Sequence, residues 1–284
     1  MLTLGRYRIT AVQDGTFALD GGALFGTVPR ALWERQMAPD ALNRVRLAAR
    51  CLLAADDAGR RRILVGAGMG DDWDARSREH HAIDRSGGGI DAGLARLGLT
   101  RADVTDVILT HLHLDHARGA TRRRPDGTLE LAFANATHHL QRRHWQWALA
   151  PSDRDARCFR PDEFELLEHS GRLHLVEGEV ELLPDLQIIV SEGHTVAQHL
   201  PRFHGGGTHL TCCGDVIPTR AHIRAPWAMA CDLLPLTALD EKKMLLAQAL
   251  EDDGILFLEH DPEVAACRLR EEEGHPAFRE AVEL

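Results

Sequence analysis

Three imidazoles and one carboxylate lie within six consecutive residues of this chain. The run reads His-Leu-His-Leu-Asp-His and starts at residue 111. Neutral imidazole nitrogen and ionised carboxylate oxygen suit Zn, Fe, Mn, Co and Ni ions. The preceding segment 106–110 is aliphatic and β-branched, which predicts a buried strand ending at the cluster. We expect His111 and His113 to leave the strand end on one side. Asp115 and His116 enter the next turn, so the spacing predicts two neighbouring metal positions.

Three further candidate ligands follow aliphatic runs later in the chain. His194 follows 186–190, Asp215 follows 208–213, and His260 follows 255–258. A ligand at a strand exit is held by a rigid element yet faces a site built from loops. Their order after the first run therefore indicates one shared site.

In these motifs the sequence resembles the metallo-β-lactamase superfamily, whose His-x-His-x-Asp-His run is followed by a His, an Asp and a His. All seven ligand positions of that pattern are filled. The resemblance implies a first metal held by His111, His113 and His194. It implies a second metal held by Asp115, His116 and His260, with Asp215 bridging the two.

The same resemblance implies an α/β fold, a four-layer αβ/βα sandwich with the metal site at the shared edge of two sheets. With 284 residues and 44% hydrophobic content, the chain can bury a sizeable core. Since the candidate ligands are spread from 111 to 260 and must converge, we expect a single domain over residues 1–284.

Segments 20–29, 32–33 and 217–229, outside the ligands, resemble the YtnP-type quorum-quenching lactonases, relatives of the N-acyl-homoserine lactonases. This likeness implies that metal-bound hydroxide opens a lactone or a related ester, a small-molecule substrate. Two divalent ions are the expected cofactors, with Zn preferred and Mn, Co or Fe as alternatives. Asp115 is expected to pass a proton to the leaving group. His222 is the candidate for a further catalytic contact with the substrate.

Three positions depart from the family pattern. Cys231 stands where those relatives usually carry a tyrosine, and the chain's single tyrosine is Tyr7. Gly66 stands where an acid is expected to support the metal loop, which predicts a lower metal affinity. Gln198 replaces a second histidine that usually follows the ligand at 194.

Other activities remain open on this scaffold, because a fold does not determine a substrate. Thioester or phosphotriester hydrolysis is the alternative to lactone opening. A diiron redox protein is a further alternative, although such relatives usually replace His113 by Glu. An inactive metal-binding homologue is the third, motivated by Gly66 and Cys231.

Hydrophobic patterning predicts strands near 4–12, 48–54 and 62–65. Helices are expected in four segments, namely 29–37, 91–97, 135–148 and 240–250, the last capped by Thr237 or Asp240. Two charged segments, 71–89 and 151–162, read as surface loops that can flank the pocket. Phe25, Trp33, Trp227 and Met229 read as core or as an apolar wall for an acyl chain.

A formal net charge of −10 argues against a nucleic-acid surface, which needs clustered basic residues. The six cysteines show no regular framework and read as reduced core thiols. No apolar run approaches the roughly 18 to 20 residues that span a bilayer. We therefore expect a cytoplasmic protein with no membrane partner, and a homodimer is an open possibility.

Overall fold

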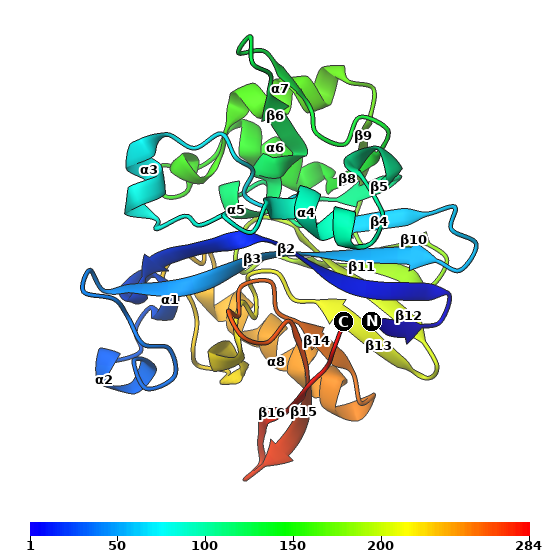
Figure 1. Ribbon diagram of the computed structural model, residues 1–284. Coiled ribbons are helices and arrows are strands. Elements are labelled where there is room, and N and C mark those ends of the chain that lie inside the picture. Colours follow the sequence, from blue (N-terminus) through cyan, green and yellow to red (C-terminus); the bar gives the residue numbers. More distant parts are fainter.

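Two seven-stranded sheets stack face to face in the computed structural model, which describes residues 1–284 (Figure 1). The first sheet has the order β1 (Leu2–Leu4), β2 (Tyr7–Asp20), β3 (Arg44–Asp56), β4 (Arg62–Val65), β5 (Asp106–Ile108), β8 (Thr137–Gln141) and β9 (Leu173–Val176). The second has the order β10 (Val180–Leu183), β11 (Leu186–Ser191), β12 (Gln198–Gly205), β13 (Thr208–Cys212), β14 (Ile255–Phe257), β15 (Ala266–Glu272) and β16 (His275–Ala281). A short hairpin, β6 (Thr121–Arg123) and β7 (Leu129–Leu131), stands apart.

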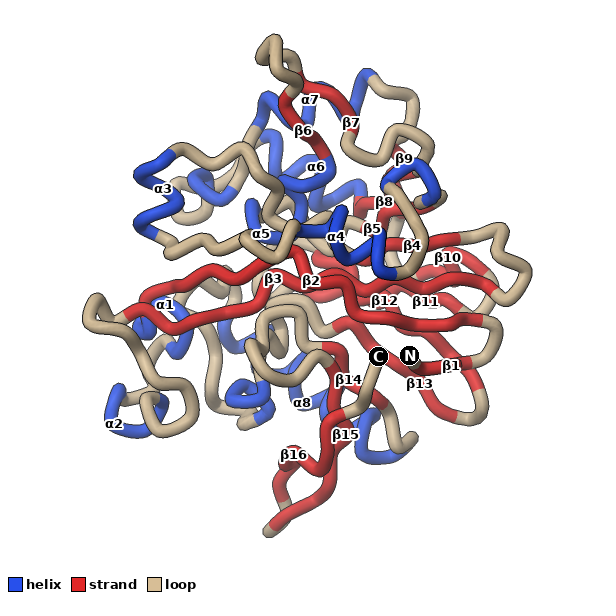
Figure 2. Tube along the Cα trace, viewed as in Figure 1, coloured by secondary structure: helices blue, strands red, loops and turns tan.

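Helices cover the outer faces of the two sheets (Figure 2). On the side of the first sheet lie α3 (Ala75–His80), α4 (Gly89–Arg96), α5 (Leu114–Ala117), α6 (Arg142–Leu149) and α7 (Pro161–His169). On the side of the second sheet lies α8 (Pro235–Glu251). The short helices α1 (Gly21–Phe25) and α2 (Arg30–Trp33) follow the long strand β2. The predicted four-layer αβ/βα sandwich is confirmed.

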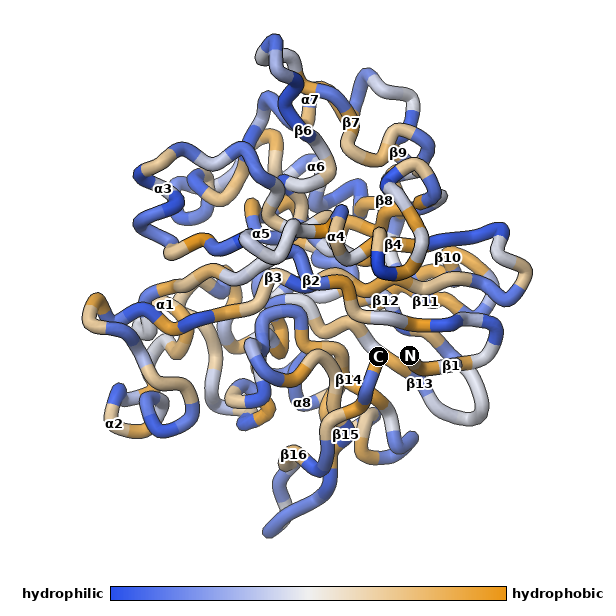
Figure 3. The backbone as a smooth tube through the Cα atoms, viewed as in Figure 1, coloured by the Kyte–Doolittle hydropathy of each residue, from blue (hydrophilic) through white to orange (hydrophobic).

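Alternating side chains of the strands fill the layers between these elements. In β4, Ile63 packs into the core between the sheets, whereas Leu64 packs into the core beneath α4, α6 and α7. Successive side chains of a strand point to opposite faces, so a strand buried on both sides is hydrophobic throughout. Figure 3 shows this as hydrophobic stretches along the central strands and hydrophilic residues at the tip of the β15–β16 hairpin. None of the helices is both long and apolar enough to cross a membrane.

Most predicted elements appear, with shifted ends. The predicted strands near 4–12, 48–54 and 62–65 correspond to β1–β2, β3 and β4, and the helix at 91–97 to α4. The helix predicted over 29–37 is only the single turn α2. Helix α8 starts earlier than predicted, with Pro235 in its first turn and Leu234 as its N-cap, so neither Thr237 nor Asp240 caps it.

The helix predicted over 135–148 is wrong in its first half. Residues 137–141 form β8, which pairs in parallel with β5 on one side and β9 on the other. The sheet supplies hydrogen bonds along both edges of this segment, and this tertiary context overrides the helical spacing of its apolar residues. Only α6 at the end of the predicted segment is helical.

A buried carboxylate stabilises the first sheet where β5 begins. Asp106 is 1% exposed, and Arg61 Nη1 donates to both of its oxygens at 2.9 Å. Thr105 Oγ1 donates at 2.7 Å, and His139 Nε2 lies 3.0 Å away. Burial alone would raise the pKa of Asp106, but the hydrogen bonds from His139, Thr105 and Arg61 outweigh it and lower the pKa to about 2.

The lowered pKa of Asp106 predicts acid sensitivity. A carboxyl whose pKa is lower in the folded state stabilises the fold above its unfolded pKa of 3.8 and loses that contribution as the pH falls to about 2. We expect Asp106→Asn to lower the free energy of unfolding by about 2 kcal/mol at neutral pH. Urea unfolding at pH 7, 4 and 2.5 measures this, with the exposed Asp57→Asn as control. An unchanged pH slope in Asp106→Asn would contradict it.

Candidate metal centre

All seven side chains predicted as ligands meet at one edge of the two sheets. Each lies where a strand has just ended: the 111–116 run follows β5, and His194, Asp215 and His260 follow β11, β13 and β14. They form two groups whose ligand atoms lie within 4.8 Å of one another. The first group is His111, His113, His194 and Asp215, and the second is Asp115, His116 and His260.

Asp215 faces both groups with one carboxylate. Its Oδ2 lies 3.1 Å from His194 Nε2 and 3.7 Å from His111 Nε2. Its Oδ1 lies 3.2 Å from His116 Nε2 and 3.0 Å from His260 Nε2. Each oxygen therefore belongs to one group, which is the geometry of a bridging carboxylate.

The donor set fits divalent cations. His194 Nε2 and His113 Nδ1 lie 3.1 Å apart, and His116 Nε2 and His260 Nε2 lie 2.9 Å apart. The buried Nε2 of His111 has no hydrogen-bond partner at all. Lone pairs of neutral imidazoles at these distances repel one another, whereas a cation between them would be coordinated by all of them.

Asp215 and the surrounding imidazoles shift one another's pKa. Burial lowers the pKa of His111 and His113 well below the ordinary range, and neighbouring imidazoles lower it further. Burial would raise the pKa of Asp215, but His116, His194 and His260 hold it well below the usual range. Burial would lower the pKa of these three histidines, but Asp215 raises it, that of His194 to about 9. Imidazoles must be neutral to coordinate a metal, so a cation would displace protons from these three rings.

The outer ring nitrogens of four candidate ligands each contact a neighbouring group. His260 Nδ1 donates to Ala48 O at 2.8 Å, and His111 Nδ1 lies 3.1 Å from Thr110 Oγ1. His194 Nδ1 lies 2.9 Å from Asp232 Oδ1, and His116 Nδ1 lies 2.9 Å from Glu259 Oε2. Since a carbonyl or carboxylate oxygen accepts, such contacts place the proton on Nδ1 and leave Nε2 free to face the centre.

His144 in α6 ties two ligand loops together. Its Nε2 accepts the backbone N–H of Leu112 at 2.8 Å, and its Nδ1 donates to Val196 O at 2.7 Å. The ring is fully buried, and burial lowers its pKa to about 4, so it stays neutral. His144 therefore fixes the loop of His111 and His113 relative to the loop of His194.

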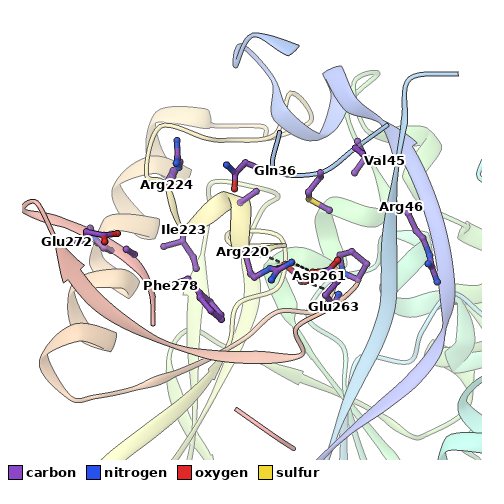
Figure 4. Close-up of a pocket in the computed structure, with 16 residues that line it drawn as sticks. Gln36, Val45, Arg46, Arg220, Ile223, Arg224, Asp261, Glu263, Glu272 and Phe278 are labelled. Atoms are coloured by element: carbon purple, nitrogen blue, oxygen red, sulfur yellow. Dashed lines mark hydrogen bonds and ion pairs between the residues drawn. The ribbon is translucent and has the colours of Figure 1, made fainter. Parts of the chain in front are cut away.

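Ion pairs brace the loop that carries His260 from its other side. Asp261 Oδ2 accepts the backbone N–H of Arg220 at 2.8 Å, and the Arg220 side chain pairs with Asp261 and Glu263 (Figure 4). These residues line a groove of about 640 Å³ between the segment that follows α2 and the β15–β16 hairpin. No candidate ligand lines this groove, so the ion pairs hold the His260 loop without contacting the candidate metal centre.

A second, mostly apolar pocket of about 340 Å³ opens onto the candidate ligands. Of its 19 lining residues, 12 are hydrophobic, among them Phe17, Leu19, Leu47, Met69 and Met229. Its remaining wall includes Asp115, His113, His194, Asp215 and His260. An apolar hollow ending at a polar cluster suits a ligand with a hydrophobic chain and a polar reacting group.

Both loop segments predicted to flank the pocket do so. Trp73, His81 and Ile83 from the 71–89 segment line it, and so do Arg157 and Cys158 from the 151–162 segment. The first segment contains the unpredicted helix α3.

The aromatic residues considered for the wall pack behind the pocket. Phe25 and Trp33 stack with ring centroids 5.1 Å apart, and Trp227 meets Phe25 edge-on. Of the four residues considered for the wall, only Met229 lines the pocket. The other three therefore belong to the core, the alternative reading of the sequence.

The prediction that His222 contacts the substrate is wrong. His222 is fully buried and lies outside the pocket wall. Its Nδ1 lies 2.7 Å from Thr219 Oγ1 and its Nε2 lies 3.0 Å from Leu24 O. Its ring stacks on Phe25, and burial lowers its pKa to about 3. With both nitrogens occupied, His222 is a neutral core residue that fixes α1 against the turn after β13.

The six cysteines are all free, and four of them are buried. Cys158 and Cys231 instead line the pocket, so the expectation of core thiols is wrong for these two. Cys231 is exposed at the pocket wall, yet the protein atoms packed around its sulfur raise the pKa of its thiol well above the ordinary value, and Asp232 raises it further. Cys231 therefore stays protonated, which argues against a thiolate nucleophile.

Asp232 and Glu259 are polar residues of the centre that the sequence did not single out. Both are buried, and both face a ligand imidazole. The only sequence signal was an acid within a few residues of a ligand or of the expected substrate loop. Which imidazole each acid would reach depends on the fold.

A buried lysine holds the loop that carries Asp232. Lys242 in α8 is 1% exposed, and its Nζ donates to Trp227 O. Burial lowers the pKa of Lys242 to about 8, although nearby Asp232 opposes this shift.

The lowered pKa of Lys242 predicts a gain of stability in alkaline solution. Between pH 8 and 10.5 the unfolded chain holds a proton at this lysine that the folded chain has lost, so the free energy of unfolding rises with pH. Relative to Lys242→Met, the wild type should gain about 3 kcal/mol across that window. Chemical unfolding of both proteins at pH 7.5 and 10.5 measures it. The exposed neighbour Lys243→Met should show no such change, and a constant difference for Lys242→Met would contradict the prediction.

Comparisons with known proteins agree with this geometry. A family profile described as "Metallo-beta-lactamase superfamily" matches residues 47–260. The N-acyl homoserine lactonase AiiA of Bacillus thuringiensis subsp. kurstaki is 26% identical over 180 residues, which cover 62% of this chain and 64% of that protein. The N-acyl homoserine lactonase AttM of Azorhizobium caulinodans is 37% identical over 79 residues, or 28% of this chain and 26% of the relative. The chain thus spans less than two thirds of the length of the curated relatives it matches.

Solved structures share the fold over its whole length. A probable metal-dependent hydrolase from Staphylococcus aureus superposes with a TM-score of 0.87 at 26% identity, covering 99% of this chain and 100% of that one. AidC, a dizinc quorum-quenching lactonase in complex with a product, superposes with a TM-score of 0.80 at 18% identity, covering 100% and 97%. At that identity the second likeness concerns the fold alone.

Proposed function

Because this chain belongs to the metallo-β-lactamase superfamily, we propose that it is a dinuclear metal-dependent hydrolase that opens a lactone or a related ester. The observation that carries the proposal is the Asp215 carboxylate, whose two oxygens face two separate groups of imidazoles. A single bound cation would leave one of these groups without a partner. Both sheets contribute ligands, which supports a single functional domain over residues 1–284.

Two divalent cations fit the centre. His111, His113, His194 and Asp215 would hold the first, while Asp115, His116, His260 and the other oxygen of Asp215 would hold the second. Zinc suits this nitrogen and oxygen donor set, and Mn, Co or Fe are alternatives. Such a pair of cations supplies an ionised water at neutral pH and polarises the carbonyl under attack.

Side chains of the protein would transfer the proton and bind the substrate. Asp115 lines the pocket, its side chain is 25% exposed, and its Oδ2 lies 3.6 Å from His260 Nε2. It is placed to pass a proton to the leaving oxygen when the ring opens. The apolar wall binds the acyl chain and keeps bulk water from the reacting carbonyl. No side-chain nucleophile is required.

The lactone is favoured over other esters by the shape of the pocket together with the relatives. A cavity that ends at the ligand cluster and is otherwise apolar matches a small cyclic ester carrying a hydrophobic chain. The curated relatives that match are named N-acyl homoserine lactonases. Cytoplasmic residence and a homodimer stay predictions of the sequence.

Metal content and turnover test the proposal together. Protein reconstituted separately with Zn, Mn and Co should hold two ions per chain and open a long-chain N-acyl-homoserine lactone, seen as acid release. His116→Ala removes a ligand of the second cation, so we expect one ion per chain and at least a hundredfold lower kcat. His275→Ala, in the β15–β16 hairpin, is the control. Two bound ions without lactone turnover would contradict the lactonase proposal and favour thioester or phosphotriester hydrolysis.

The apolar wall predicts a preference that depends on chain length. Leu19 lines the pocket and is partly exposed, so Leu19→Trp should shorten the space for the acyl chain. We expect KM to rise about tenfold for a decanoyl lactone and to change less than twofold for a butanoyl lactone. Leu19→Met, of similar volume, should leave both values unchanged. Equal changes for the two substrates would show that the acyl chain lies elsewhere.

A further inference from the structure

Glu259 is a buried carboxylate committed to one candidate ligand. Its side chain is 1% exposed, and its Oε2 lies 2.9 Å from His116 Nδ1. Neither oxygen of this carboxylate has a partner with full hydrogen-bond geometry, so the close approach to His116 is its one polar side-chain contact. A buried charge is costly unless it is paired, so an acid in this place implies a specific partner. His116 is that partner.

Neighbouring segments hold the backbone on both sides of Glu259. The preceding Leu258 donates its N–H to Ala265 O at 2.8 Å, and the following His260 donates to Pro218 O at 3.1 Å. His260 O accepts the N–H of Ala48 at 3.0 Å. Residue 259 is therefore held from both sides by neighbouring segments.

Arg50 adds a charge to this bracing. Its Nη1 donates to Leu258 O at 2.8 Å and to Asp261 O at 2.9 Å, on either side of Glu259. A guanidinium so close to the buried carboxylate offsets part of its desolvation cost. The loop that carries Glu259 is therefore held by a cationic side chain.

Two consecutive residues thus contact the two nitrogens of one imidazole. Glu259 faces Nδ1 of His116, and His260 faces Nε2 of the same ring at 2.9 Å. A carboxylate only accepts, so Glu259 favours a proton on Nδ1 of His116 and leaves Nε2 to face the centre.

The family pattern led us to expect an acid at position 66 that supports the metal loop, but this chain has a glycine there. Gly66 has a φ of +76°, and a Cβ added there would meet only Cys51 Sγ, at 3.6 Å. The carboxylate that faces His116 comes instead from the loop after β14 of the other sheet.

We propose that Glu259 is the positioning residue of the second cation site, where it orients His116 and thereby sets that site's affinity for a divalent cation. The inference rests on the proposed function, because it assumes that His116 is a ligand. Asp232 has the corresponding place beside His194 of the first site, but it also accepts the N–H of Met229 at 3.1 Å. Each acid therefore serves a different site.

Cobalt binding to metal-free protein tests the proposal. Glu259→Gln keeps the shape and removes the charge, and we expect affinity at one of the two sites to fall 10- to 100-fold. Affinity at the other site should change less than twofold. Asp232→Asn is the matched control and should weaken the other site instead. Equal weakening of both sites by Glu259→Gln, or no weakening, would overturn the proposal.

A conservative variant shows whether Glu259 acts through its reach to His116. Glu259→Asp keeps the charge but shortens the reach by one methylene, so the second site should still weaken. Wild-type affinity in that variant would also contradict positioning.

Nitrogen NMR of the zinc-loaded protein gives a readout that does not depend on activity. With a cation at Nε2, His116 should carry its proton on Nδ1, and Glu259→Gln should shift that Nδ1–H resonance because the carboxylate acceptor is gone. An unchanged resonance would overturn the role of Glu259. A wild type that binds fewer than two cobalt ions would instead refute the proposed dinuclear site, so the two failures are distinguishable.

Discussion

One buried carboxylate sets the arrangement of the whole centre. The two carboxylate oxygens of Asp215 lie 3.0 to 3.2 Å from the Nε2 atoms of three imidazoles that come from different loops. Its negative charge attracts these rings in their protonated form and so raises the pKa of His116, His194 and His260. The strand that ends at residue 212 fixes this carboxylate, and the surrounding loops are placed to meet it.

Successive layers of contacts hold the candidate ligands in place, starting from the strands of the two sheets. Strand ends give each ligand its backbone position, and the outer nitrogens then meet Ala48 O, Asp232 or Glu259. Beyond these contacts, Lys242 donates a hydrogen bond to the loop that carries Asp232, and Arg220 donates one to Asp261 in the loop that carries His260. Precision of a fraction of an ångström at a metal site requires such layers, because an unsupported side chain populates several rotamers.

The sequence predicted the parts of this protein that depend on local spacing. The 111–116 run and the three later ligand positions follow from motifs at the ends of aliphatic segments, and the sandwich follows from the family resemblance that these motifs carry. What failed depends on tertiary contacts. Residues 137–141 form a strand because two neighbouring strands flank them, and His222 is core because Leu24 and Thr219 occupy its nitrogens. Glu259 adjoins a ligand in sequence, yet only the fold shows that it serves His116.

The contact between His116 and His260 joins residues 144 positions apart in the chain. Contacts of such large sequence separation form late in folding, because much chain entropy is lost before they contribute. The first sheet and the second must therefore have docked before the two ring nitrogens can meet. A nascent chain exposes the first four candidate ligands long before the last one is synthesised, so the complete centre can assemble only after translation has passed residue 260.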